Sequence, residues 1–328
     1  MKRQLLGVAA ILLSISTYAQ DNPLWMRYCA ISPDGTTIAF TYKGDIYTVP
    51  STGGRASQIT TNPAHDTKPI WSPDGKKIAF ASDRMGSMDI FEVNKEGGIP
   101  KRLTTHSGNE TPVAYKDAGH ILFLANIMPT AEDAQFPSGQ FQQVYEVNTE
   151  GGRPILFSSM PMEDISINHT GNTLLYHDKK GYEDPWRKHH TSSITRDIWL
   201  CSLNGNRTFR KQTAFNGEDR TPVWASDDKS FYYLSEEKGS FNIFKRDIDG
   251  NTSKQITNHT KHPVRFLSAA SNGTLCYGYD GEIYTVKEGA IPQKVQISIV
   301  TDKNDKDLIR QIKRNGATEI SLSPDAKE

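Results

Sequence analysis

Short apolar runs alternate with polar turn residues along most of the chain, and the runs return in a fixed order. The first copy of this order consists of Ser32-Pro33-Asp34-Gly35, Ile38-Ala39-Phe40 and Asp45-Ile46-Tyr47. The second copy consists of Trp71-Ser72-Pro73-Asp74-Gly75, Ile78-Ala79-Phe80 and Asp89-Ile90-Phe91. Apolar runs bounded by Gly, Pro, Asp and Ser predict β-strands. A Pro-Asp-Gly turn predicts a tight link between two antiparallel strands, because Pro fixes φ and Gly accepts a positive φ.

Four weaker copies follow, and each places a polar turn before an apolar triplet and a later aromatic strand. The turn positions of the six copies are Gly35, Gly75, Gly119, Gly171, Asp228 and Gly273. Successive turns therefore lie 40 to 57 residues apart. Repeats of this length with several strands each indicate propeller blades. The sequence predicts an all-β protein, a six-bladed β-propeller of four-stranded antiparallel blades over residues 25–297.

The strands of one predicted blade differ in their polarity. The apolar triplets predict strands buried on both faces, and large aromatic residues of the following strand, such as Tyr47 and Phe91, are expected to pack between neighbouring blades. The short outer strands, such as Gln58-Ile59-Thr60, mix polar and apolar residues and suit an edge exposed to water. One such blade cannot bury both of its faces, whereas a closed ring of six buries them all.

The start of the chain has a different pattern. A positive start at Lys2 and Arg3 precedes an apolar stretch over residues 5–15, and small residues follow up to Ala19. This order is typical of a secretory signal peptide, here over residues 1–19 with cleavage after Ala19. The alternative is a transmembrane anchor, but the apolar stretch is shorter than the ~20 residues that a spanning helix needs. We therefore expect a periplasmic or secreted protein with no membrane span after cleavage.

Composition narrows the class of protein further. The 328 residues include 38 Lys and Arg and 38 Asp and Glu, and only 36% are hydrophobic. The low hydrophobic content argues against an integral membrane protein with many spans. The balanced charge, without a long basic run, gives no reason to expect nucleic-acid binding. The three cysteines, Cys29, Cys201 and Cys276, have neither disulfide-framework nor zinc spacing, so we expect buried small side chains.

The repeat resembles that of two known families. The run Trp71 to Phe80, with Asp89-Ile90-Phe91 and Leu103-Thr104 behind it, is similar to the repeat of the periplasmic propeller protein TolB and of the N-terminal propeller of tricorn-type serine peptidases. The start of the propeller directly after the signal leaves no room for the α/β domain that precedes it in TolB. The insertion over residues 181–193 also resembles that of bacterial tricorn homologues. The resemblance to tricorn-type peptidases implies that a second propeller, a PDZ-like domain and a catalytic domain follow this propeller in the parent protein.

The last residues begin the repeat again. Residues 298–316 include a charged stretch and are expected to form a connector. Within 317–328, the run Ile320-Ser321-Leu322-Ser323-Pro324-Asp325 restates the strand and turn that Ile31-Ser32-Pro33-Asp34 begin in the first repeat. We therefore expect the start of a further, truncated repeat, and a chain that is the front part of a longer protein.

Motifs for catalysis do not occur in the sequence. It has no G-x-S-x-G elbow, H-E-x-x-H helix, C-x-x-C pair or P-loop. We therefore expect no catalytic residue, no metal site and no cofactor in this chain. The tricorn resemblance implies that the parent protein is a serine endopeptidase.

A first set of candidate binding residues lies in the insertion of the fourth repeat. It consists of Tyr182, Trp186, Arg187, His189 and His190. Aromatic side chains together with Arg suit a peptide or its carboxylate. A metal site at the His-His pair is not expected, because adjacent residues in an extended chain point in opposite directions. The alternative is a structural loop that packs on a neighbouring domain or subunit.

A second set is expected at the start of the innermost strands, facing the mouth of the central channel. It consists of Asp66, Glu110, Asp164, Asp219 and His262. One interpretation is structural: these side chains cap turns and bond to backbone amides. The other is a polar entrance that filters unfolded peptides.

Three functions follow from these patterns. The first is the non-catalytic propeller region of a secreted or periplasmic tricorn-like peptidase, which gates or guides peptide substrates or docks subunits. The second is a stand-alone, TolB-like protein-binding scaffold of the periplasm. The third is the propeller of a prolyl-oligopeptidase-like enzyme. The expected partners are peptides or a protein partner, the downstream propeller, PDZ and protease domains, and further copies of the chain.

Overall fold

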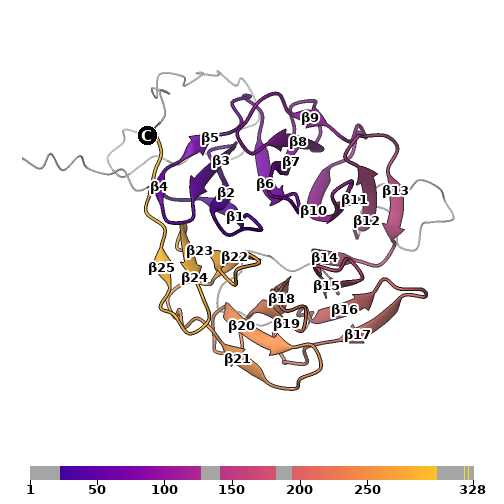
Figure 1. Cartoon of the computed structure of the whole chain (residues 1–328), viewed down its shortest axis with the longest axis vertical. Coiled ribbons are helices and arrows are strands. Elements are labelled where there is room, and N and C mark those ends of the chain that lie inside the picture. Colours follow the sequence, from indigo (N-terminus) through magenta and orange to yellow (C-terminus); the bar gives the residue numbers. More distant parts are fainter. Residues whose placement is uncertain (1–22, 127–140, 182–193, 301–320, 322–323, 325–328) are drawn as a thin grey trace, which may run out of the picture.

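The computed structural model describes residues 23–126, 141–181, 194–300, 321 and 324. In these ranges the chain forms strands β1 to β26 and no helix. Six four-stranded antiparallel sheets stand around a central axis like the blades of a propeller (Figure 1). This arrangement confirms the predicted fold class. The described residues therefore include no helix that could cross a membrane.

Every blade runs in sequence order from the innermost strand, at the axis, to the outermost strand, at the rim. Blade 1 consists of β1 (Arg27–Ile31), β2 (Thr37–Tyr42), β3 (Asp45–Pro50) and β5 (Ser57–Gln58). Blade 2 consists of β6 (Asp66–Trp71), β7 (Lys77–Ser82), β8 (Asp89–Asn94) and β9 (Lys101–Arg102). Blade 3 consists of β10 (Glu110–Asp117), β11 (His120–Ala125), β12 (Gln143–Asn148) and β13 (Ile155–Ser158). Blade 4 consists of β14 (Met162–Ile167), β15 (Thr173–Asp178), β16 (Ile198–Ser202) and β17 (Thr208–Lys211). Blade 5 consists of β18 (Asp219–Trp224), β19 (Ser230–Ser235), β20 (Asn242–Asp247) and β21 (Ser253–Gln255). Blade 6 consists of β22 (Arg265–Ala269), β23 (Leu275–Tyr279), β24 (Glu282–Val286) and β25 (Gln293–Lys294).

The Ser-Pro-Asp-Gly turns close the first hairpin of a blade as the sequence indicates. In the second blade the Ser72 hydroxyl donates to Asp74 Oδ1 at 2.7 Å and accepts the Lys77 backbone N–H at 2.9 Å. Gly75 has φ +66°, which Gly adopts without strain. The hydrogen bond from Ser72 is the largest of the effects that lower the pKa of Asp74. The same bonds recur at Ser32 and Asp34 in the first blade.

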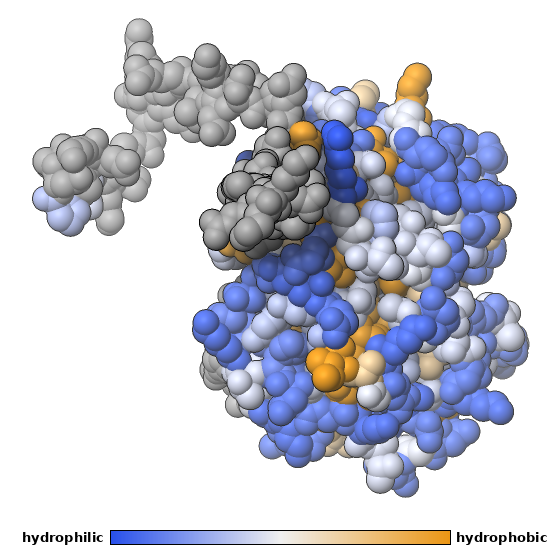
Figure 2. Space-filling model, turned by 60° about the vertical axis from the view of Figure 1, so that its left-hand side comes forward, coloured by the Kyte–Doolittle hydropathy of each residue, from blue (hydrophilic) through white to orange (hydrophobic). Residues whose placement is uncertain are grey.

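The core lies between the blades. Phe80 of β7 and Phe91 of β8 pack with Ile46 of the first blade in one buried cluster. Equivalent aromatic pairs stack within other blades, with ring centroids 5.8 Å apart for Phe40 and Tyr47 and 5.7 Å apart for Phe123 and Tyr145. This confirms the expected packing of aromatic residues between blades. The surface seen in Figure 2 is mostly hydrophilic, with hydrophobic residues in small separate patches.

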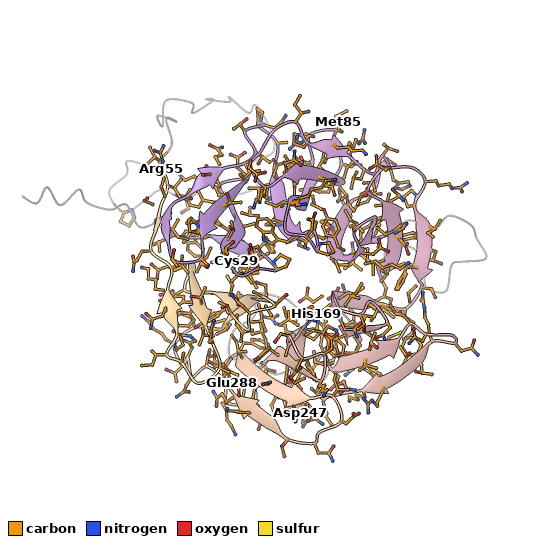
Figure 3. The ribbon with its side chains drawn as sticks, in the orientation of Figure 1. Cys29, Arg55, Met85, His169, Asp247 and Glu288 are labelled. Atoms are coloured by element: carbon orange, nitrogen blue, oxygen red, sulfur yellow. The ribbon has the colours of Figure 1, made fainter. Side chains whose placement is uncertain are left out.

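The ring closes between the last blade and the first. After β25 the chain returns to the first blade, where β26 (Ile297–Ser298) pairs in parallel with β4 (Gly54–Arg55). Gly54 N donates to the Gln296 carbonyl at 2.8 Å. On the axis side, Ile31 N donates to Ser268 Oγ at 3.0 Å, and Figure 3 shows Cys29 on the side of the first blade that faces the last. Each blade is thus built from one continuous segment, and a two-residue strand joins the ends.

Candidate functional site

Every innermost strand carries a β-bulge close to its start. Strand pairing shifts at this point in all six blades, for example between Thr67 and Ile70 in β6. In five blades a residue of the bulge has a positive φ: Tyr28 (52°), Lys68 (54°), Asp164 (48°), Thr221 (52°) and Phe266 (57°). The third blade has Pro112 at this place, and its ring fixes φ at a negative value. A bulge re-aims side chains, and here it turns them toward the axis.

These six bulge residues line a single cavity on the propeller axis. The cavity has a volume of about 640 Å³, which lies within the range of ligand pockets. Apolar side chains such as Ile70, Val113 and Leu267 form part of its wall. The rest is polar and strongly charged, so the cavity combines apolar contact with fixed charges.

A hydrogen-bonded group on the fourth blade forms one side of the wall. Glu163 accepts from Lys179 Nζ at 2.7 Å and lies 3.3 Å from His177 Nε2. The Thr221 backbone N–H donates to His177 Nδ1 at 3.2 Å. Burial opposes ionisation of Glu163, but the hydrogen bonds from His177 and Lys179 outweigh it and hold its pKa well below the usual range. His177 thus positions a carboxylate.

Two arginines beside this group share a carboxylate behind the wall. Arg196 Nη1 lies 3.0 Å and Arg220 Nη1 3.5 Å from Glu218 Oε1, and Glu218 is fully buried. The Arg220 guanidinium also stacks over the Phe241 ring, 4.1 Å from its centroid. Burial lowers the pKa of Arg220 to about 10, so it stays charged at neutral pH. The arrangement supplies fixed positive charge, which suits binding more than proton transfer.

Three of the residues predicted to face the channel mouth do not face it. Asp66, Glu110 and Asp219 do begin the strands β6, β10 and β18, but their exposed fractions are 0%, 0% and 1%. Asp66 is held by both of its oxygens, at 3.0 and 2.9 Å, by Arg84 Nη2. The prediction of a polar entrance was therefore wrong for these three, because a strand's first residue points into the blade here and the bulge residue points to the axis.

The other two members of that set occupy different places. Asp164 is a bulge residue and not the first residue of its strand; it lines the cavity and accepts from Thr221 Oγ1 at 2.6 Å. His262 precedes β22, lies 3.3 Å from Asp280 through Nε2, and does not line the cavity. Only Asp164 of the predicted set therefore contributes to the axial site.

The insertion candidates Tyr182, Trp186, Arg187, His189 and His190 lie outside the described residues. Among the residues that are described, no group of three or more His, Cys, Asp and Glu side chains is placed to hold a metal ion.

The sequence reasoning missed the cationic residues of the cavity. They are Lys68, Lys179, Arg196, Arg220 and Arg265. A signal for some of them was present, because Lys68 stands two positions, and Arg220 one position, after the carboxylate that begins the inner strand. The bulge that turns these positions toward the axis has no such signal, since its positive-φ residues other than Asp164 are of types that rarely adopt this conformation.

The fold and the axial site define the class of protein as a six-bladed β-propeller with a cavity on its axis. Residues 23–290 match the family model of the tricorn protease N-terminal β-propeller domain. The chain therefore belongs to this family, which confirms the resemblance seen in the sequence.

Curated relatives support the same assignment. The chain is 25% identical over 281 residues to "Tricorn protease homolog 1" of Streptomyces coelicolor, covering 84% of this chain and 25% of that protein. It is 27% identical over 295 residues to "Tricorn protease homolog" of Saccharolobus solfataricus, covering 86% of this chain and 26% of that protein. The chain thus spans about a quarter of the length of these relatives.

Solved structures share the fold. The crystal structure of the tricorn protease matches with a TM-score of 0.70 and 21% identity, over 86% of this chain and 27% of that chain. TolB from Acinetobacter baumannii matches with a TM-score of 0.59 and 15% identity, over 80% of this chain and 61% of that chain. At these low sequence identities, the two matches show only that the architecture is shared.

Proposed function

We propose that this chain is the non-catalytic N-terminal propeller region of a larger tricorn-like serine peptidase, and that its axial cavity guides peptide substrates. The observation that carries the proposal is the cavity of about 640 Å³ on the axis, lined by a bulge residue from every blade. Strained backbone that recurs around one cavity is typical of a functional site. Membership of the family over residues 23–290 supports the link to a peptidase.

The complete protein provides the test. We expect it to hydrolyse both an unfolded polypeptide and a short fluorogenic peptide, and we expect the 328-residue chain by itself to hydrolyse neither. Thr111 lines the cavity, so Thr111→Trp narrows it. This change should lower kcat/KM for the polypeptide about tenfold, or ~1.4 kcal/mol, and leave the short peptide unaffected.

Thr61→Trp is the matched control, because Thr61 is exposed and does not line the cavity. A complete protein without peptidase activity would contradict the assignment to a peptidase. An equal loss of both activities in Thr111→Trp would contradict guidance through the cavity.

We further propose that the protein is exported and that residues 1–19 are removed after Ala19. The pattern of a charged start, an apolar stretch and small residues supports this. N-terminal sequencing of the protein from the envelope and medium fractions should give Gln20 as the first residue. Recovery of an intact Met1 only in the cytosolic fraction would overturn the proposal. The stand-alone TolB-like scaffold has no observation in its favour beyond the shared architecture.

A further inference from the structure

The charges around the axial cavity do not balance. Its lining contains five cationic side chains: Lys68, Lys179, Arg196, Arg220 and Arg265. The carboxylates of the lining are Glu163 and Asp164, and Glu218 lies directly behind the wall. The site thus has two more positive than negative groups.

The carboxylates that are present are already engaged with the fourth and fifth blades. Glu163 binds Lys179 at 2.7 Å and lies 3.6 Å from Arg196. Glu218 binds Arg196 at 3.0 Å and lies 3.5 Å from Arg220. Asp164 accepts the Thr221 hydroxyl at 2.6 Å. These contacts neutralise one side of the cavity and leave the cation of the second blade without a direct salt bridge.

Lys68 is the cation of the second blade. Its ammonium group lies 5.8 Å from the centroid of the Tyr28 ring, and the salt bridges between described residues do not include it. Burial is the main effect on Lys68 and lowers its pKa, with the nearby charges of Asp164 and Glu163 acting in the opposite direction. A desolvated ammonium without a close carboxylate is a ready partner for an anionic ligand.

The uncharged part of the lining indicates what else the ligand carries. The Tyr28 and Phe266 rings lie 4.8 Å apart where the first and sixth blades meet. Ile70, Val113 and Pro222 add aliphatic surface from other blades. A ligand that uses the whole cavity therefore combines carboxylates with apolar or aromatic groups.

We propose that the axial cavity binds acidic peptide segments, with side-chain carboxylates directed to Lys68 and apolar side chains against Tyr28 and Phe266. The peptide nature of the ligand rests on the proposed function, whereas its negative charge rests on the lining. A cavity with low-dielectric walls concentrates the potential of such charges and draws oppositely charged ligands to it.

Fluorescence anisotropy with the 328-residue chain tests this proposal. The probe is a dye-labelled, N-acetylated and C-amidated peptide in which Glu alternates with Phe, and the reference is the same peptide with Gln in place of Glu. We expect the Glu peptide to bind at least about tenfold more tightly, and the difference to shrink at high salt. Equal affinities of the two peptides would overturn the proposal.

Lys68→Met keeps an unbranched side chain that is one atom shorter and removes the charge. It should weaken binding of the Glu peptide about tenfold, because one charge-assisted contact is lost. The control is Lys76→Met, which makes the same change at a side chain that is 77% exposed on a turn. Unchanged affinity in Lys68→Met, with an unaltered melting temperature, would contradict the placement of the peptide carboxylates at Lys68.

A third peptide separates side-chain carboxylates from a terminal one. The Gln peptide with a free C-terminus should bind as weakly as its amidated form, and tight binding of it alone would overturn the proposal. No hydrolysis is read in this assay. A complete protein without peptidase activity would therefore refute the proposed function and leave the binding result intact. Equal affinities of the Glu and Gln peptides would refute the binding of acidic segments and leave the proposed function intact.

Discussion

Single polar groups in the core join two of the blades to their neighbours. The Trp71 indole N–H donates to the Ala30 carbonyl of the first blade at 2.8 Å, and Trp224 donates to the Ser166 carbonyl of the fourth blade at 3.1 Å. Both rings are buried, with exposed fractions of 9% and 6%. The Trp that precedes a turn in the repeat is therefore a core residue and a donor at the same time. This is why one aromatic residue can fix the relative position of two blades.

Threonines two residues after the outer strands act in a similar way within a blade. The hydroxyls of Thr60, Thr104, Thr213 and Thr257 accept the backbone N–H of Ile46, Ile90, Ile198 and Ile243 at 2.9 to 3.0 Å. Each bond satisfies a buried amide at the start of the third strand, and a buried amide left unpaired is costly. The recurring Thr of the repeat is thereby explained as a structural residue.

Glu110 leads to a prediction about pH. Burial raises its pKa to about 7, above the usual value of 4.5. A raised pKa in the folded state means that folding is favoured while the group is protonated in both states, and that stability is lost as pH rises from about 4.5 to 7. Glu110→Gln removes this loss. We expect the variant to unfold like the parent at pH 4 and to be about 3 kcal/mol more stable at pH 8.

Urea unfolding over this pH range measures the effect. Glu96→Gln is the control, because Glu96 is 72% exposed and its substitution should change stability by less than ~0.5 kcal/mol at either pH. A Glu110→Gln variant that is less stable than the parent at pH 8 would show that the carboxylate is favourably bound.

At the scale of the element, the inner strands differ from ordinary strands through their bulges. A positive φ costs a non-Gly residue roughly 1–2 kcal/mol, and most for β-branched and bulky side chains. The chain nevertheless places Thr221, Tyr28 and Phe266 there. The gain is the orientation of side chains toward the axis, where all three line the cavity.

The bulge at Thr221 can be tested with two substitutions. Thr221→Gly and Thr221→Val both remove the hydroxyl that bonds Asp164, but only Gly relieves the positive φ. We expect the Gly variant to be about 1 kcal/mol more stable than the Val variant in urea unfolding. At Thr67, which has no positive φ, the order should reverse because Val favours a strand. The same order at both positions would contradict a strained bulge.

The sequence predicted the turns and strands because each has a local cause. Pro33, Asp34 and Gly35 fix their turn by their own backbone preferences, and the triplet 38–40 must be buried wherever it lies. The bulges could not be predicted, since neither Lys68 nor Phe266 belongs to a type that favours positive φ. The sequence places Asp164 together with Asp66 at the start of an inner strand, but the strand pairing shows that Asp164 corresponds to Lys68. The direction of each side chain, and hence the axial site, depends on the bulge.

At the scale of the whole molecule, the ring is held shut by little backbone pairing. The blades on either side of the closure are complete in themselves, and β26 adds two residues beside β4. Side-chain contacts supplement this elsewhere between blades: Glu288, labelled in Figure 3, lies 2.9 Å from Lys245 and 2.8 Å from Lys254 of the fifth blade. The first and last blades also share the backbone hydrogen bonds Met26 N to Gly281 O at 3.1 Å and Ser271 N to Pro33 O at 2.9 Å. The turn before β4 adds to ring stability by letting the returning chain approach.

Gly53 permits that approach and gives the last prediction. Its φ is +92°, and a Cβ at this position would lie 2.6 Å from the Gln296 carbonyl oxygen. Gly97 is the matched control: it occupies the same turn of the second blade with φ +93°, and its nearest neighbour would lie 3.6 Å away. Both Ala variants carry the strain of a positive φ, ~1 kcal/mol, but only Gly53→Ala also displaces the chain at Gln296.

We expect Gly53→Ala to lose at least about 1 kcal/mol more free energy of unfolding than Gly97→Ala, since it combines backbone strain with a steric clash. Hydrogen exchange should also accelerate at the amides of Gly54 and Ala56, which donate to Gln296 and Ser298 at 2.8 and 2.9 Å. Equal losses in the two variants with unchanged exchange would mean that the interface of the first and sixth blades, around Ile31 and Ser268, closes the ring without the β4–β26 pair.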